Sequence, residues 1–136
     1  MARILLVEDD AGVRGFVGKA LTLVGHEVVE AEDGGLAEDI LSAEDGRFDL
    51  MLSDIRMPVM DGIALTFSAK HKFPALTIVL MTGFAEQRER ADGLSALVYD
   101  VISKPFSLNE LIARVDEAIA GGPATPWAER RAAWNG

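Results

Sequence analysis

Four side chains of this 136-residue chain have the types and positions to handle a phosphoryl group together: Asp9, Asp54, Thr82 and Lys104. Each closely follows a short apolar run of the kind that forms a buried strand. Carboxylates bind divalent cations, while a hydroxyl and an ammonium bind phosphoryl oxygens. If the runs are parallel strands, all four side chains emerge at one edge of one sheet. The pocket they share could hold a metal ion and accept a phosphoryl group on a carboxylate.

Hydrophobic periodicity predicts the strands and helices that would position these side chains. Apolar runs predict strands at residues 4–7, 28–29, 49–53, 76–81 and about 97–102. Between them, apolar residues spaced three and four apart predict helices over 13–24, 36–41, 63–72 and 108–119. Gly25 would end the first helix, and Ser107 with Glu110 would begin the last as a capping box. Residues 86–93 are mostly charged, so the helix predicted there is marginal.

Strands that alternate with helices imply parallel pairing through right-handed crossovers, and hence a three-layer, doubly wound α/β sandwich. The near-continuous apolar runs agree with this fold class, because a sheet covered on both faces needs no polar alternation. A site is expected at the carboxyl ends of the strands, near the point where the strand order reverses. The four side chains named above lie at that edge.

Composition and charge narrow the possible classes of function. The formal net charge is −9, which repels nucleic acid, and the basic groups at 70–72 and 130–131 are short. No run reaches the roughly 18–20 apolar residues that cross a bilayer, and we see no secretion signal. The absence of cysteine excludes disulfides and thiolate metal sites. We therefore expect a cytoplasmic protein that binds neither nucleic acid nor membrane.

The length suits a single domain, which we expect to occupy residues 1–120. Residues 121–136 would form a tail without an effector domain. Trp127 and Trp134 lie seven apart and would share one face of a short helix. Two interpretations of this tail stay open. It folds back on the domain or is disordered, or it docks a partner.

The acidic run Glu8-Asp9-Asp10 also has two interpretations. It can be a solvated turn in which Asp10 caps the first helix. It can instead belong to a metal site, because a divalent cation would relieve the repulsion among adjacent carboxylates. Mg²⁺ takes one or two protein carboxylates together with waters and a phosphate oxygen. Asp9 is then the candidate ligand, and Glu8 a second one acting through water.

Four short motifs end the predicted strands in order. They are Val-Glu-Asp-Asp at 7–10, Asp-Ile-Arg-Met-Pro-Val-Met-Asp-Gly at 54–62, Met-Thr-Gly at 81–83 and Ser-Lys-Pro-Phe at 103–106. Together they resemble the receiver domain of bacterial two-component response regulators, and the resemblance covers about residues 2–120. It implies a flavodoxin-like (βα)5 sandwich with a parallel five-stranded sheet of order 2-1-3-4-5.

The resemblance assigns roles to individual residues. Asp54 would be the phosphoacceptor. Mg²⁺, or Mn²⁺, would be held by Asp9, Asp54 and the backbone carbonyl of Arg56, and by Glu8 through water. The side chain of Arg56 would not contact the metal, and with Phe84 it would modulate the lifetime of the phosphoryl group. Phe84 would hinder the hydrolytic water, although ordinary packing also explains its position.

Lys104 would place its ammonium against the acceptor carboxylate, and its bond to Pro105 is cis in the family. The alternative is a surface lysine. Thr82 would bind a phosphoryl oxygen and move inward with the loop after it. Receivers usually carry Tyr or Phe three residues before the lysine, whereas this chain has Val101 at that switch position. Tyr99, two residues earlier, would face the same side of the strand.

These roles predict a stand-alone response regulator that takes a phosphoryl group from a sensor histidine kinase or a histidine phosphotransfer protein and then changes its protein-binding surface. Its only catalysis would be its own phosphorylation and slow autodephosphorylation. The residues around the site look like the CpdR type of alphaproteobacterial regulator, which controls substrate delivery to an AAA+ protease. We expect a monomer, or a weak dimer through the face of the fourth helix, fifth strand and fifth helix.

Two other functions stay open. One is a phosphatase with an aspartyl-phosphate intermediate, although Arg56 stands where such enzymes commonly place a second Asp. The other is a pseudo-receiver that binds partners without phosphate.

Overall fold

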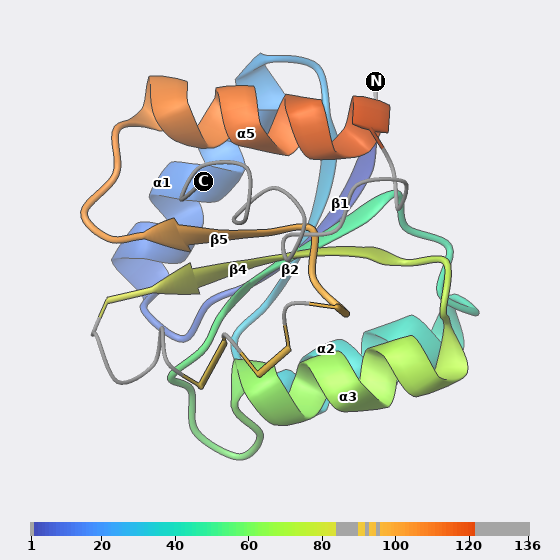
Figure 1. Ribbon diagram of the computed structural model, residues 1–136. Coiled ribbons are helices and arrows are strands. Elements are labelled where there is room, and N and C mark those ends of the chain that lie inside the picture. The colour runs from blue at the N-terminus through green and yellow to red at the C-terminus, as the bar shows by residue number, and fades with distance from the viewer. Residues whose placement is uncertain (1, 84–89, 92, 95, 122–136) are drawn as a thin grey trace, which may run out of the picture.

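The computed structural model describes residues 2–83, 90–91, 93–94 and 96–121. Figure 1 shows strands alternating with helices along the chain. The strands are β1 (Arg3–Val7), β2 (Glu27–Ala31), β3 (Leu50–Asp54), β4 (Thr77–Thr82) and β5 (Asp100–Ser103), and the helices are α1 (Ala11–Leu23), α2 (Gly34–Ala43), α3 (Gly62–Lys72) and α5 (Leu108–Gly121). The marginal helix predicted at 86–93 lies largely outside the described residues, and so does the tail with Trp127 and Trp134. None of the described helices combines the length and apolar character that crossing a membrane requires.

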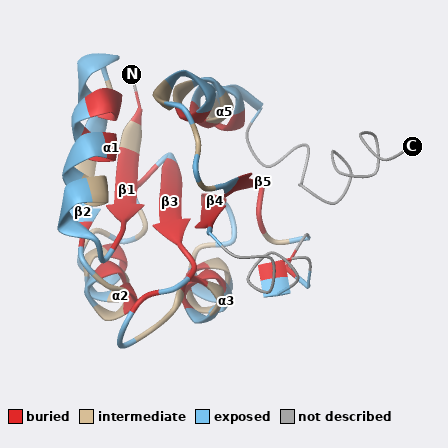
Figure 2. Ribbon diagram, turned by 90° about the vertical axis from the view of Figure 1, so that its left-hand side faces the viewer, coloured by how far each residue is buried: buried red, intermediate tan, exposed pale blue. Residues whose placement is uncertain are grey.

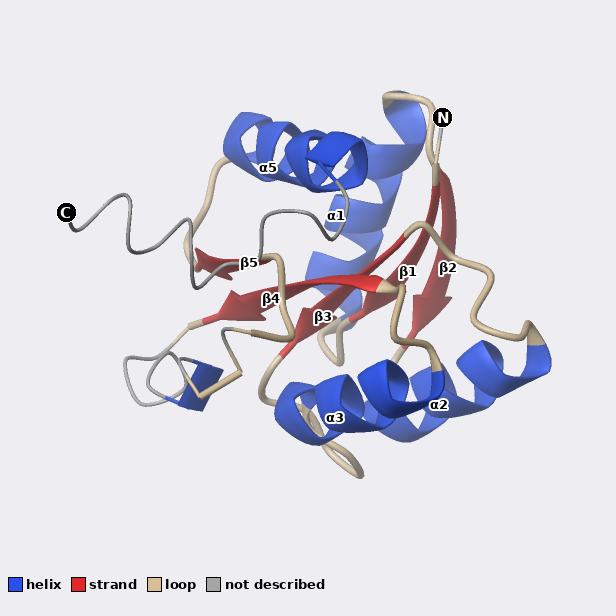
Figure 3. Ribbon diagram, turned by 45° about the vertical axis from the view of Figure 1, so that its right-hand side comes forward, coloured by secondary structure: helices blue, strands red, loops and turns tan. Residues whose placement is uncertain are grey.

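The strands form one parallel sheet in the order β2-β1-β3-β4-β5. This confirms the predicted fold class and strand order. Helices α1 and α5 cover one face of the sheet and α2 and α3 the other, which gives three layers (Figures 1 and 3). Because β2 and β3 lie on opposite sides of β1, the loops that leave β1 and β3 diverge and leave room for a site between them.

Two apolar cores form, one on each face of the sheet. Leu5 and Met51 point into the core under α2 and α3, while their neighbours Leu6 and Leu52 point into the core under α1 and α5. All residues of β3 and β4 are buried, as Figure 2 shows for the centre of the sheet. Each large apolar side chain buried in this way contributes about 1.5–3 kcal/mol. The strands are therefore firm supports for the residues at their carboxyl ends.

Polar side chains begin the helices. The N-caps are Asp10 for α1, Asp33 for α2 and Asp61 for α3. The hydroxyl of Ser107 accepts a hydrogen bond from the N–H of Glu110 at 3.1 Å, which is one half of the predicted capping box, whereas the carboxylate of Glu110 pairs with Nη1 of Arg114 at 3.3 Å. Gly25 directly follows the C-cap of α1 with φ of +101°, a conformation that glycine adopts without steric cost.

The largest departure from the predicted elements is at β5, which begins at Asp100 rather than near residue 97. Tyr99 packs in the core under α1 and α5, and its hydroxyl lies 3.4 Å from Oε1 of Glu117. Val101 packs in the opposite core. The prediction that Tyr99 and Val101 share a side is therefore wrong, because strand alternation starts only at Asp100.

Candidate functional site

Three carboxylates meet at the carboxyl ends of β1 and β3. Glu8 and Asp9 directly follow β1, and Asp54 is the last residue of β3. One oxygen from each carboxylate lies within 4.8 Å of the other two. Glu8 is 1% exposed and Asp54 6%, whereas Asp9 is open to solvent. Carboxylates arranged in this way can bind a hard divalent cation that keeps part of its water shell.

A lysine from the loop after β5 completes this cluster. Nζ of Lys104 lies 3.1 Å from Oε2 of Glu8 and 3.3 Å from Oδ2 of Asp54. Its backbone N–H donates to the carbonyl of Thr82 at 2.7 Å, and its bond to Pro105 is cis. Lys104 is thus anchored beside the end of β4 while its ammonium lies between two buried carboxylates.

Burial and charge alter the proton affinities in the cluster. Burial, followed by the negative charge of Asp54, raises the pKa of Glu8 from 4.5 to about 7, although Lys104 opposes the shift. Burial lowers the pKa of Lys104, but Asp54 and Glu8 outweigh this effect, so the pKa of the lysine is raised. The ammonium therefore stays charged at neutral pH. Lys104 pairs with Glu8 and Asp54, and Asp9 adds a third carboxylate to the cluster, an arrangement that suits a divalent cation.

The loop after Asp54 holds the carboxylate of this residue in place. The N–H of Ile55 is shared between Oδ1 of Asp54, at 2.9 Å, and the carbonyl of Met81 on β4, at 3.1 Å. The N–H of Gly62 donates to the carbonyl of Ile55 at 2.7 Å. A Cβ at Gly62 would lie only 2.3 Å from the carbonyl oxygen of Asp54. Glycine is required there because α3 begins directly against the backbone of Asp54.

The chain matches the family model described as the response regulator receiver domain over residues 4–116. It belongs to the receiver domain family. Receiver domains are signalling modules of two-component systems rather than conventional enzymes. The parallel sheet and the acidic cluster described above are consistent with this family.

Two relatives show how much of other proteins this receiver spans. It is 40% identical over 119 residues to the response regulator receiver protein CpdR of Brucella abortus (strain 2308), an alignment that covers 88% of this chain and 98% of CpdR. It is 35% identical to the DNA-binding transcriptional regulator NtrC of Klebsiella pneumoniae over 85% of this chain, but that alignment covers only 24% of NtrC. The likeness to CpdR therefore extends over nearly a whole protein, and that to NtrC over about a quarter of one.

A solved structure shares both the fold and part of the sequence. The response regulator protein TrrA from Thermotoga maritima, crystallised in complex with Mg²⁺-BeF, has a TM-score of 0.75 and 29% identity to this receiver. The comparison covers 86% of this chain and 98% of TrrA.

The remaining residues singled out from the sequence lie around the cluster. Thr82 is buried at the end of β4, at the same sheet edge as Asp54 on neighbouring β3. Arg56 lies in the turn after β3 with an exposed side chain. Val101 is 1% exposed, inside the core under α2 and α3. Phe84 lies outside the described residues.

Two features of the site were not predicted. Glu8 contacts Lys104 directly, whereas the sequence suggested only a water-mediated role at the metal. Arg14 donates to the backbone carbonyl of Glu8, six residues earlier in the chain. The sequence offered one signal for this contact of Arg14. It places a long donor side chain in the first turn of a helix that follows an acidic run.

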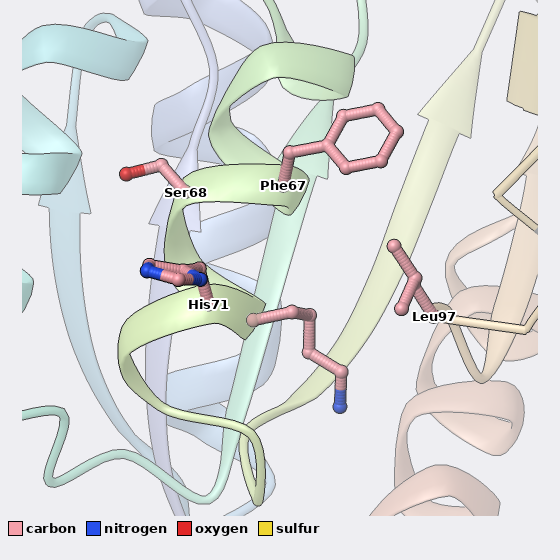
Figure 4. A pocket seen from close by; sticks show the side chains of 5 residues that line it. Phe67, Ser68, His71 and Leu97 are labelled. Atoms are coloured by element: carbon pink, nitrogen blue, oxygen red, sulfur yellow. The ribbon is translucent and has the colours of Figure 1, made fainter.

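A hollow apart from the carboxylate cluster lies between α3 and the segment before β5. Its volume is about 580 Å³, and its lining residues are Phe67, Ser68, Lys70, His71 and Leu97. Figure 4 shows Phe67 and Leu97 on opposite sides of this hollow. None of these lining residues carries a carboxylate, and Nζ of Lys70 donates to two backbone carbonyls in the turn after α3. Among the described residues, the lining of this hollow therefore offers none of the groups that phosphoryl transfer to a carboxylate requires.

Proposed function

We propose that this receiver accepts a phosphoryl group from a phosphohistidine onto the carboxylate of Asp54. The observation that carries the proposal is the ammonium of Lys104, 3.3 Å from Oδ2 of this buried residue. A carboxylate oxygen would form the new O–P bond as the P–N bond to the donor breaks, and the imidazole nitrogen keeps the electron pair. Lys104 would then pair with the added negative charge. Autodephosphorylation would be slow.

The carboxylate cluster fits Mg²⁺ or Mn²⁺. Three carboxylates converge there, and two of them, Glu8 and Asp54, are buried and share the ammonium of Lys104. Asp9, Asp54 and the carbonyl of Arg56 are the proposed direct ligands, with Glu8 acting through water. When bound, the ion would neutralise charge on the phosphoryl oxygens. The TrrA complex with Mg²⁺-BeF supports this assignment by similarity.

Phosphorylation would be read out by Thr82 and the segment after β4. The Thr82 hydroxyl would bind a phosphoryl oxygen and draw that segment inward. Val101 is buried and β-branched, so it offers no aromatic ring that could reorient between two positions. We therefore propose that the change of shape on phosphorylation occurs in Thr82 and the segment after β4 rather than in β5. The proposed effect of Phe84 and Arg56 on phosphoryl lifetime rests on their sequence positions alone.

The proposed output is a change in protein binding. Because the alignment covers 98% of CpdR but 88% of this chain, we propose that residues 1–120 form a receiver of the CpdR kind and that residues 121–136 form a tail outside it. We propose that the protein is cytoplasmic and that a sensor histidine kinase or a histidine phosphotransfer protein supplies the phosphoryl group. The likeness to CpdR-type regulators makes AAA+ protease machinery the proposed target. We propose that the protein acts as a monomer or as a weak dimer whose interface would be β5, α5 and the segment before them. It would contact neither nucleic acid nor membrane.

Incubation with Mg²⁺ and acetyl phosphate tests this function. Intact-mass spectrometry should show one added phosphoryl group on the wild type and none on Asp54→Asn. Asp39→Asn removes an exposed carboxylate on α2 and should be modified like the wild type. Sustained hydrolysis of a generic phosphate ester would indicate a phosphatase instead. A wild type that binds partners but takes no phosphoryl group would indicate a pseudo-receiver.

A further inference from the structure

Arg14, in the first turn of α1, reaches back to the strand end that carries the acidic cluster. Its Nη1 donates to the backbone carbonyl of Glu8 at 2.7 Å. Its Nε lies 3.6 Å from Oε1 of Glu30 on β2. Only 19% of the Arg14 side chain is exposed, so its guanidinium is held between the helix and the edge of the sheet.

Gly18 gives Glu30 the room to face Arg14. A Cβ at Gly18 would lie 3.2 Å from Oε2 of Glu30 and 3.5 Å from Cδ2 of Leu6. The carboxylate of Glu30 therefore lies across the part of α1 that lacks a side chain. Because this carboxylate is 46% exposed, its pairing with Arg14 contributes orientation more than stability.

Hydrogen bonds fix both backbone polar groups of Glu8. Its N–H donates to the carbonyl of Ala31 on β2 at 3.1 Å, and its carbonyl accepts from Arg14. That carbonyl and the N–H of Asp9 belong to one rigid peptide plane. Anchoring the carbonyl therefore fixes the direction in which the chain enters Asp9.

We propose that Arg14 is a positioning residue, which holds the Glu8–Asp9 peptide so that both carboxylates face Asp54. The inference rests on the proposed function, since it concerns the residues that would hold the metal. Arg14 itself would touch neither the metal nor the phosphoryl group. Its effect would pass through the backbone of Glu8.

A purely electrostatic role and a positioning role of Arg14 predict opposite changes in Mg²⁺ affinity when Arg14 is replaced. Removing a nearby positive charge strengthens the binding of a divalent cation to carboxylates. Removing the anchor weakens binding, because the ligands must then be ordered by the metal itself. The direction of the change in Mg²⁺ affinity therefore separates a positioning role from a purely electrostatic one.

The test is calorimetric titration of Mg²⁺ into the wild type, Arg14→Met and Arg14→Lys, with thermal unfolding in EDTA measured alongside. Arg14→Met keeps the apolar stem but loses the donor, and its Kd should rise by about tenfold. Arg14→Lys keeps a donor and should recover most of the affinity. Lys19→Met removes an exposed charge from the same helix and should leave the Kd unchanged or slightly lower.

A Kd for Arg14→Met equal to or below that of the wild type overturns the positioning role. If Arg14→Met does not fold in EDTA, Arg14→Gln replaces it with the same expectation, because the shorter amide cannot reach the Glu8 carbonyl. Normal Mg²⁺ binding by the wild type with no loss in these variants would remove only this inference. A wild type that binds no Mg²⁺ would contradict both this inference and the proposed metal site.

Discussion

The ammonium of Lys104 lies 3.1 Å from Oε2 of Glu8, so a residue that follows β5 pairs directly with a residue that follows β1. The same Nζ is 3.3 Å from Oδ2 of Asp54. One positive charge thus serves two buried carboxylates, with Asp9 close by. Burial, and after it the negative charge of Asp54, raises the pKa of Glu8 even though Lys104 opposes the shift.

Replacing Lys104 by Met would leave Glu8 and Asp54 without their shared cation. At about pH 8 in EDTA, we expect the free energy of unfolding to fall by about 1–3 kcal/mol, because two buried carboxylates lose a charged partner. The loss should be smaller than for a fully buried pair, since the Lys104 side chain is 26% exposed. Mg²⁺ should restore part of it. Urea unfolding measures both effects, and a loss no larger than that of exposed Lys19→Met would contradict the pairing.

Glu8 should make the stability of the metal-free protein depend on pH. Its pKa is about 7 in the folded protein against an ordinary value of 4.5, so between these values the folded protein binds the proton more tightly than the unfolded chain. The contribution of Glu8 is therefore complete below about pH 4.5 and is lost as the pH rises through about 7.

Glu8→Gln removes this titration. We expect the Tm of the variant, relative to wild type in EDTA, to increase between about pH 5 and about pH 8. Differential scanning calorimetry across this range provides the measurement. A difference that does not change with pH would show that the pKa of Glu8 is not raised.

Gly62→Ala should damage the site through the backbone. The new Cβ would lie 2.3 Å from the Asp54 carbonyl oxygen, so α3 or the end of β3 must shift. We expect a loss of about 1–3 kcal/mol in the free energy of unfolding and slower phosphorylation by acetyl phosphate. Gly15→Ala is the matched control, because it lies in α1, where the new Cβ would have no atom within 4 Å apart from its chain neighbours and the backbone of its own helix. It should stabilise by about 0.5–1 kcal/mol and leave phosphorylation unchanged.

Val101→Ala should lower the free energy of unfolding without impairing phosphorylation. Val101 is buried in the core under α2 and α3, so the cavity should cost about 1–3 kcal/mol. Acceptance of phosphate should stay nearly intact, because the side chain lies outside the carboxylate cluster. Parallel measurement of unfolding and of acetyl phosphate labelling checks both expectations. Loss of labelling in a folded variant would contradict them.

The positions of Asp9, Asp54 and Lys104 at one sheet edge could be predicted because parallel strands all end at the same edge. That argument needs only apolar runs, their order and the polar residue after each run. It does not need side-chain packing. The strand order itself came from the family resemblance rather than from the periodicity.

The features that were missed depend on side chains from distant elements. Asp100 is 1% exposed and accepts two hydrogen bonds from Arg114 on α5, at 2.8 and 2.5 Å. This ion pair accompanies the late start of β5, and Tyr99 packs toward α5 instead of following the alternation of the strand. Likewise, the contact between Glu8 and Lys104 joins residues 96 apart in the chain. Periodicity carries no information about such long-range pairs.

Borohydride treatment of the phosphorylated protein, followed by peptide mass spectrometry, tests the central claim most directly. Hydride reduces an aspartyl phosphate to homoserine and so marks the residue that held the phosphoryl group. After Mg²⁺ and acetyl phosphate, we expect conversion of Asp54 alone, both in the wild type and in Asp39→Asn. Conversion of Asp9 or Glu8 instead, or of no carboxylate at all, would contradict the account.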